Sequence, residues 1–384
     1  MNPSKFAAEI LAAANEEQES MIDFLSQLVR VESPTSAPDS QAGIFMILFE
    51  GLEDAGLKVK LFPGQEYGGY LEATGPKKNN SQRQQLLIGH CDTVWPIGTI
   101  KDMPFVQEGN VIRGPGAYDM KGGLTQLIYA LKIIKNLGLE PLMRPVVLIN
   151  SDEESGSKES RTQIESLAKQ AARVYVLEPS LGLKGKLKTA RKGVGRFDIH
   201  VTGKSAHAGL EPEKGVSAVL EMSYMVQKLH ALNDPEKGIS VNVGKIEGGL
   251  QSNVVPPSSR AEIDVRVPSM LDAEQIEKQL LNLQPQLEGT TISVKGGINR
   301  PPLEKTPRNH ELWATAHRIG QTLGLDLSSG TAGGGSDGNY TSQFASTLDG
   351  LGAVGDGAHA KHEFIFVDKM IERTALLTLL LLSP

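Results

Sequence analysis

The hydrophobic pattern of the chain changes twice, and this is the strongest constraint on its fold. In the first 183 residues, apolar runs such as QLLIGH and PVVLIN alternate with helical periodicity, as in residues 17–31, 42–57 and 122–138. Strands that alternate with helices are typical of an α/β layer with a largely parallel sheet. We therefore expect this part of the chain to form such a layer.

From about residue 184 the pattern is that of a different architecture. Four segments with period-two alternation (GVGRFDIHVTGKS, ISVNVGKIEGG, RAEIDVRVP and TISVKGGI) surround helical stretches at 215–232 and 272–285. This order predicts a four-stranded antiparallel sheet with helices on one face. The α/β pattern resumes with HELWATAHRIGQTLGL, so we expect a domain at 184–298 inserted into a catalytic domain made of 1–183 and 299–384.

Composition and charge exclude several classes of partner. The chain has 384 residues, enough for two domains, and its 39 Lys and Arg against 45 Asp and Glu indicate no basic face for nucleic acid or anionic lipid. The C-terminal run ALLTLLLL is far shorter than the roughly 20 residues that span a bilayer, so we expect a docking helix and no membrane association. The N-terminus lacks the apolar core of a secretion signal, and Cys91 is the only cysteine, which together predict a cytoplasmic protein.

Acidic residues and a histidine follow the predicted parallel strands. In open α/β sheets ligands bind beyond the carboxyl ends of the strands, so these side chains should meet in one crevice. Converging carboxylates repel one another unless a cation compensates their charge. Imidazole and carboxylate suit zinc or a similar divalent ion, and this mixture can hold two ions. The residues concerned are His90, Asp92, Asp119, Asp152, Glu153, Glu154 and Glu178.

The spacing within these clusters suggests separate tasks. On extended backbone His90 and Asp92 point to the same side, so Asp92 can accept the second ring N–H of His90. Glu153 and Glu154 would point to opposite sides of extended backbone. One could then bind metal while the other faces a water molecule.

Eight motifs in order extend this prediction by resemblance. They are GHCDTV, GPGAYDMKGG, DEESGS, LEPS, GKSAHAGLEPEKGVSA, QSNVVPPSSRAEIDVRVP, GGGSDGN and HAKHEF. From about residue 25 to 370 the chain resembles the dinuclear zinc exopeptidase family of glutamate carboxypeptidase, acetylornithine deacetylase and succinyl-diaminopimelate desuccinylase, and is most similar to glutamate carboxypeptidase. The resemblance implies a three-layer α/β/α catalytic domain with an inserted α+β, ferredoxin-like domain for dimerisation and closure.

The resemblance also implies roles for the strand-end residues. Asp119 would bridge two zinc ions, His90 and Glu178 would complete one site, and Glu154 and His359 the other. Glu153 would be the general base that takes a proton from the attacking water and passes it to the leaving amine. His359, four residues before Glu363, matches the family's pattern better than its neighbour His362.

Residues of the inserted segment and of the loop after it match the family's substrate site. His207 of the SAHAG motif would reach into the partner subunit's active site and donate to the developing oxyanion. Arg266, Arg300 and Asn253 are candidates for binding a free carboxylate, together with Gly334, Gly335 and Ser336 of the glycine-rich loop. Two of these residues have a plainer alternative: a surface histidine for His207, and a cross-strand ion pair for Arg266.

The functional prediction is a zinc-dependent hydrolase that cleaves an amide bond next to a free carboxylate. Release of C-terminal glutamate or a similar amino acid from a small peptide is the first expectation, and deacylation of an N-acyl amino acid is the alternative. A non-catalytic binding scaffold is a third reading. We expect two zinc ions per subunit, with cobalt or manganese as substitutes, and a homodimer formed through the inserted domain.

Overall fold

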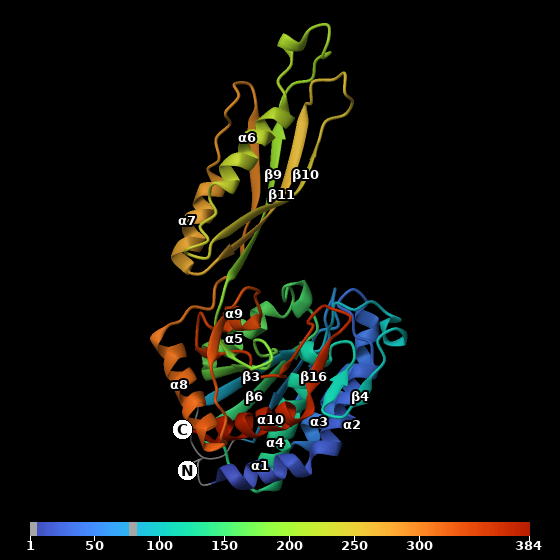
Figure 1. The fold of residues 1–384 in the computed structure, drawn as a ribbon, viewed down its shortest axis with the longest axis vertical. Coiled ribbons are helices and arrows are strands. Elements are labelled where there is room, and N and C mark those ends of the chain that lie inside the picture. Colours follow the sequence, from blue (N-terminus) through green and yellow to red (C-terminus); the bar gives the residue numbers. More distant parts are fainter. Residues whose placement is uncertain (1–5, 77–82) are drawn as a thin grey trace. The chain divides into compact units, whose positions relative to one another are not determined.

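The computed structural model describes residues 6–76 and 83–384, which form two compact units (Figure 1). The first unit runs to Ala190 and includes Lys305–Ala332 and Ser336–Pro384. The second contains Arg191–Glu304 and the short segment Gly333–Gly335. Residues 1–5, the beginning of the segment examined for a secretion signal, lie outside the described residues.

The units divide a few residues later in the sequence than the expected boundaries at 183/184 and 298/299. The reason is strand pairing: β8 (Leu187–Arg191) pairs with β13 (Ser329–Ala332), which keeps most of β8 in the first unit. On the return path β12 continues to Arg300, and Leu303 still exchanges backbone hydrogen bonds with Arg191.

A six-stranded sheet, counted over the described residues, forms the middle layer of the first unit. Its order is β1-β2-β6-β3-β7-β14, and β3 lies parallel to both β6 and β7. The strands β1 and β2 run antiparallel at one edge. The strand bounds are β1 Lys58–Phe62, β2 Tyr70–Thr74, β3 Gln84–His90, β6 Arg144–Asn150, β7 Ala171–Val176 and β14 Ser346–Leu348.

Alternate residues of the central strands bury their side chains in two different cores, which makes this unit a three-layer structure. Leu87 packs in the core beneath α4 and α10, whereas Leu86 and Ile88 pack with α5 on the other face. This alternation is what a strand covered on both faces requires. The helices are α1 Ala7–Glu16, α2 Gln18–Arg30, α3 Ala42–Asp54, α4 Gly122–Asn136, α5 Arg161–Gln170, α8 Pro307–Thr322, α9 Asp337–Thr341 and α10 Val367–Leu382.

A smaller sheet in the first unit contains strands from two distant segments. Its order is β15-β16-β5-β4, with bounds Gly355–Asp356, Phe364–Phe366, Val111–Arg113 and Val106–Glu108. It brings the segment before α10 next to the loop before α4. The apolar C-terminal run lies in α10, which packs against α4 and α1. Across the described residues, no helix is both long enough and apolar enough to cross a membrane.

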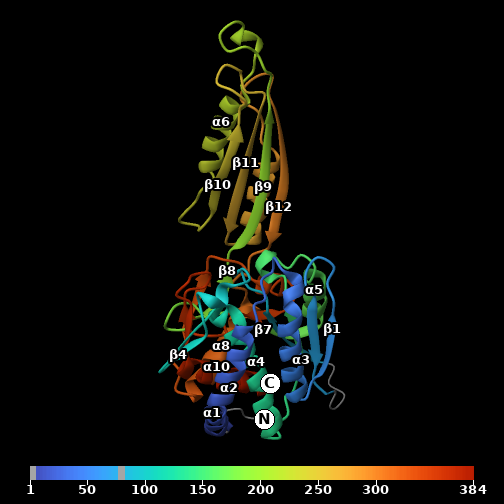
Figure 2. The same cartoon turned by 90° about the vertical axis from the view of Figure 1, so that its right-hand side faces the viewer.

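The second unit is a four-stranded antiparallel sheet (Figure 2), and both of its helices lie on one face, as Figure 1 shows. The strand order is β10-β11-β9-β12, and one core contains the inward side chains of α6, α7 and the strands. The other face carries charged residues in alternate positions. The bounds are β9 Gly193–Thr202, α6 Ala218–His230, β10 Ser240–Gly248, β11 Ser258–Val267, α7 Met270–Leu281 and β12 Thr291–Arg300.

Candidate metal centre and active site

Three adjacent parallel strands of the first unit end beside one another, and each is followed by predicted site residues. His90 is the last residue of β3, Glu153 and Glu154 follow β6, and Glu178 follows β7. Asp119 lies in the loop that leads into α4, and His359 in the turn between β15 and β16. Parallel strands align their carboxyl ends, so residues far apart in sequence converge here.

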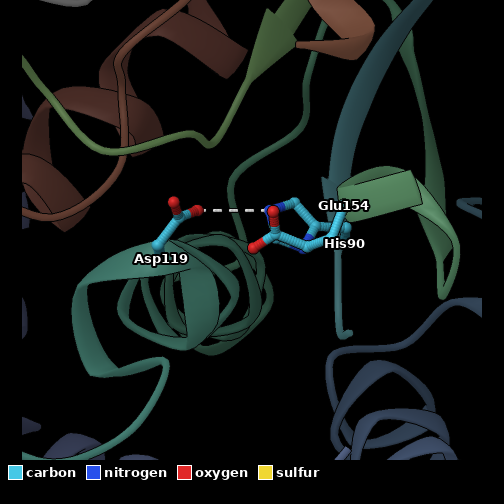
Figure 3. Close-up of side chains that lie close together, drawn as sticks. All are labelled: His90, Asp119 and Glu154. Atoms are coloured by element: carbon cyan, nitrogen blue, oxygen red, sulfur yellow. Dashed lines mark hydrogen bonds and ion pairs between the residues drawn. The ribbon is translucent and has the colours of Figure 1, made fainter. Parts of the chain in front are cut away.

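Asp119 lies between the two histidines and offers one carboxylate oxygen to each. Its Oδ1 is 3.3 Å from Nε2 of His90, and its Oδ2 is 3.5 Å from Nε2 of His359. Figure 3 shows the Asp119 carboxylate facing the His90 imidazole, with Glu154 close by. Glu178 Oε1 lies 3.5 Å from the same His90 nitrogen, and Glu154 Oε2 lies 3.2 Å from His359 Nε2.

The second ring nitrogen of His90 is occupied, which orients the imidazole. Nδ1 lies 3.0 Å from the backbone oxygen of Asp92 and 3.3 Å from its Oδ1. These two acceptors fix a proton on Nδ1. Nε2, which faces Asp119 and Glu178, is therefore the ring nitrogen that would bind a metal ion after losing its own proton. The expected His90–Asp92 contact is therefore present, and the Asp92 backbone contributes to it.

Asp92 also supports the turn that carries the two glutamates. Its carboxylate accepts hydrogen bonds from the backbone N–H groups of Glu153 at 3.3 Å and Glu154 at 3.1 Å, and from the hydroxyl of Thr35 at 2.7 Å. The backbone at Glu153–Ser155 is a 3-10 turn and not the extended strand considered from the sequence. The two side chains still separate, because Glu153 groups with His90 and Glu178, and Glu154 with His90 and Asp119.

The cluster contains more carboxylates than positively charged groups, and this imbalance shifts the pKa values of its members. Burial would lower the pKa of His90, but the carboxylates of Asp119, Asp92 and Glu178 hold it well above its usual value. Hydrogen bonds to Asp119 and Glu154 raise the pKa of His359 to about 10. Burial raises the pKa of Glu154 to about 7, against the opposing hydrogen bond from His359.

This donor set fits divalent metal ions. The potential ligand atoms within each of two groups, His90–Asp119–Glu154 and His90–Glu153–Glu178, lie within 4.8 Å of one another. Imidazole nitrogens and carboxylate oxygens are the donors that zinc and related ions take in proteins. Bound cations would also compensate the carboxylates, whose mutual repulsion is otherwise relieved by protons on the histidines and by the ammonium of Lys188 beside Glu178. The buried Cys91 is a poor nucleophile, because burial raises the pKa of its thiol.

His207 and Asn253 are neighbours in the second unit. The segments that carry them pair through His207 and Val254, and the N–H of Ala208 donates to the backbone oxygen of Asn253 at 2.9 Å. The exposed His207 ring accepts backbone N–H bonds from Gly209 and Leu210 at Nδ1, each at 3.1 Å. These bonds place its proton on Nε2 and leave that N–H for an external acceptor.

The two candidate carboxylate-binding arginines fall in one row across the sheet of the second unit. Val194 of β9 is paired with Arg266 of β11 on one side and with Arg300 of β12 on the other. A Cβ on Gly335 would lie 3.1 Å from Cδ of Arg300, so the glycine-rich loop contacts this row. Arg266 makes two hydrogen bonds to Asp264, two residues away on the same strand, and this contact is not the cross-strand ion pair of the plainer alternative.

Sequence reasoning missed several residues of both units. Lys188 is buried, with Nζ 3.7 Å from Glu178 Oε2, and Arg191 donates to the carbonyl oxygens of Gly334 and Gly335 at 3.2 and 3.1 Å. Both lie in the segment KLKTAR, which has no chemical motif of its own. Glu363 and Thr35 were also missed, because their contacts are with segments far away in the sequence. The spacing of Glu363 from His359 was a signal for the first of them, and the sequence around Thr35 offered none.

The buried imidazole of His90, the half-exposed imidazole of His359 and several carboxylates gather at the carboxyl edge of a parallel sheet, and they offer the donors that a metal-dependent hydrolase uses. Residues 86–383 match the model of peptidase family M20/M25/M40. Carboxypeptidase G2 of Pseudomonas sp. strain RS-16 is 30% identical over 378 residues, which cover 95% of this chain and 89% of that protein. Succinyl-diaminopimelate desuccinylase of Aliarcobacter butzleri is 25% identical, over 90% of this chain and 94% of that relative.

Solved structures agree in fold. The aminopeptidase PepT of Bacillus cereus superposes with a TM-score of 0.75 at 22% identity, covering 95% of this chain and 98% of that one. A dinuclear metal-binding M20 peptidase of Bacillus subtilis gives a TM-score of 0.70 at 13% identity, over 96% of this chain and 98% of that one. The chain belongs to peptidase family M20/M25/M40. The predicted α/β fold with an insertion, the predicted family and the predicted class of enzyme, a metallopeptidase, are confirmed.

Proposed function

We propose that this metallopeptidase is a zinc-dependent carboxypeptidase that releases glutamate or a similar amino acid from the C-terminus of a small peptide. The observation that carries the dinuclear part of the proposal is the position of Asp119, whose two oxygens face His90 and His359 at 3.3 and 3.5 Å. The relative named carboxypeptidase G2, which aligns over nearly the whole chain, supports the direction of cleavage.

In this proposal His90, Asp119 and Glu178 hold one ion, and Asp119, Glu154 and His359 hold the other. Zinc bound there would polarise the scissile carbonyl and lower the pKa of a water molecule. The task of the chain's own residues is to hold the ligands in place. His90 is fixed through Nδ1, and the Glu153–Glu154 turn is fixed through Asp92.

Glu153 is the general base in this proposal. Its side chain is 8% exposed and lies with Glu178 and His90, apart from the ligand group of Glu154. It takes the proton of the water that attacks the scissile carbonyl and delivers that proton to the nitrogen of the departing amine. His207 donates its Nε2 proton in a hydrogen bond to the oxygen on which negative charge develops.

The free carboxylate of the substrate is assigned to the arginine row of the second unit. A guanidinium binds a carboxylate with two parallel hydrogen bonds, which favours a terminal carboxylate over an internal peptide group. Arg300, 8% exposed and in contact with the loop of Gly335, is the more enclosed arginine of the pair. Asn253 adds an amide group on the segment that pairs with His207.

A homodimer formed through the second unit would supply His207 to the partner's site. Large apolar side chains are exposed on α6 and near β10: Val219, Leu220, Ile246 and Leu250 at 42, 45, 53 and 72%. Helix α6 packs against β10, so these residues lie on or next to neighbouring elements. Exposed apolar surface of this kind is typical of a protein interface. Cytoplasmic location is part of the same proposal and is supported by the single cysteine, Cys91.

Deacylation of an N-acyl amino acid is the second candidate, favoured by the relative named succinyl-diaminopimelate desuccinylase. Both reactions hydrolyse an amide next to a free carboxylate, so the metal chemistry does not distinguish them. The substrate series does: peptidyl- and folyl-glutamate should be turned over faster than N-acetyl and N-succinyl amino acids. Activity confined to the acyl compounds would replace the first proposal by the second.

The test of the whole site is elemental analysis of the purified protein, combined with hydrolysis before and after chelation. The expected result is about two zinc ions per chain, as the dinuclear geometry requires, and activity that disappears with chelator and returns with zinc. If the analysis finds cobalt or manganese in place of zinc, only the proposed identity of the metal changes. A protein that neither contains nor rebinds metal would disprove the proposal.

A further inference from the structure

The carboxylate of Glu363 lies behind the predicted metal ligands and takes no part in the proposed chemistry. The residue is 1% exposed, and its two oxygens accept four hydrogen bonds. Oε1 accepts the backbone N–H groups of Tyr118 at 2.9 Å and Asp119 at 3.1 Å. Oε2 accepts the N–H of Gly116 and the indole N–H of Trp95, both at 3.0 Å. All four partners are donors, which is the arrangement that an ionised carboxylate requires.

These bonds join three segments, each of which carries predicted ligands. Trp95 follows the end of β3, where His90 and Asp92 lie, and Gly116 begins the loop that contains Asp119. Glu363 is itself part of the turn that carries His359, closed by bonds from Ala360 N to Gly357 O and from Glu363 N to Ala360 O. One buried side chain therefore connects the loop of Asp119 to the turn of His359.

We propose that Glu363 is a positioning residue of the metal centre, which sets the separation of Asp119 and His359 so that each metal position receives one oxygen of Asp119. The inference rests on the proposed metal centre. Hydrogen bonds from N–H groups to an ionised carboxylate are about twice as strong as neutral ones, so they resist the repulsion among the ligand carboxylates. A glutamine at this position would turn an NH₂ group toward N–H donors and leave a buried donor without an acceptor.

The experiment compares the zinc affinity of the full-length wild type with that of Glu363→Gln, by competition with a chromophoric chelator. Loss of a partner behind the ligands should weaken the binding of at least one zinc ion by about 10- to 100-fold. The matched control is Glu372→Gln on α10, a partly exposed carboxylate that pairs with Lys369 and should leave the affinity unchanged. An unchanged affinity in folded Glu363→Gln would overturn the inference. A wild type that binds no zinc would instead overturn the proposed function.

Tryptophan fluorescence reports on the same contact without metal or substrate. The chain has two tryptophans, so a Trp313→Phe background leaves Trp95 as the single emitter. In metal-free protein, Glu363→Gln should shift the Trp95 emission, and an unshifted spectrum would contradict the contact.

If Glu363→Gln does not fold, Trp95→Phe removes one of the four donors and keeps the carboxylate. Its zinc affinity should fall by about 10-fold, the lower end of the expected range, and an unchanged value would overturn the inference.

Discussion

The carboxylate of Asp92 accepts a hydrogen bond from the backbone N–H of Glu154 at 3.1 Å, so one side chain orients both the His90 imidazole and the turn of a second predicted ligand. Asp92→Asn keeps the size of this group but presents an NH₂ to one of its N–H or O–H donors. Zinc affinity and kcat/KM should each fall by about 10- to 100-fold. Chelator competition and initial rates measure the two quantities.

Thr35→Val is the matched control for Asp92. It removes one hydroxyl donor to the same carboxylate and leaves the contacts with His90 and Glu154 in place. We expect a much smaller loss than in Asp92→Asn. Equal zinc affinities in Asp92→Asn and the wild type would show that the contacts with His90 and Glu154 are not needed to organise the ligands.

Replacement of Glu153 by Gln should separate catalysis from metal binding. General-base catalysis contributes about 10² to 10⁴ in rate, so kcat should fall by that factor while the metal content stays at the wild-type value. Glu154→Gln, one residue further on, should instead lose metal because Glu154 faces His359. Rates and elemental analysis on the same samples give both readings. Wild-type hydrolysis by Glu153→Gln would exclude it as the base.

Mixed dimers can show whether His207 acts in the partner's site. His207→Ala and Glu153→Gln should each be nearly inactive alone, since removal of an oxyanion donor costs about 10² to 10³ in kcat. If His207 acts across the dimer, a mixed dimer contains one complete site, and random mixing of subunits should restore about a quarter of wild-type activity. No recovery despite subunit exchange, followed by light scattering and mass spectrometry, would place His207 in its own subunit's site or outside catalysis.

The stability of the metal-free protein should depend on pH through His359. Its bonds to Asp119 and Glu154 raise its pKa to about 10, against about 6.5 in an unfolded chain. The folded state keeps this proton between those values, so the contribution to the free energy of unfolding is complete below about pH 6.5 and is lost as the pH rises through about 10. Denaturation in urea with chelator present, near pH 6 and above pH 10, should show a wild-type advantage over His359→Gln that shrinks at the higher pH.

The exposed His362 is the control for this titration. It lies three residues from His359 on the same turn, and His362→Gln should change stability little at either pH. A difference between the wild type and His359→Gln that is constant with pH would mean that the ion pairs of His359 do not contribute to folding.

Much of the candidate centre could be predicted because a local sequence pattern, a buried strand followed by polar residues, fixes where those residues lie in a parallel sheet. Once QLLIGH and PVVLIN are recognised as buried strands, the residues that follow them must meet at one edge. That geometry brings His90 next to Glu178 without any information on loops. The 3-10 turn at Glu153–Ser155 was not predictable in the same way, because Asp92, which follows a different strand, holds it through hydrogen bonds.

The sequence by itself determined the two folding patterns and the chemical identity of the candidate ligands, since periodicity and residue type are properties of short segments. Only the tertiary structure decided which oxygen of Asp119 faces which histidine, that Arg266 and Arg300 flank Val194, and that Glu363 ties three segments together. These are contacts between residues tens to hundreds of positions apart. They depend on how loops pack against the sheet, and hydrophobic periodicity carries no information on that packing.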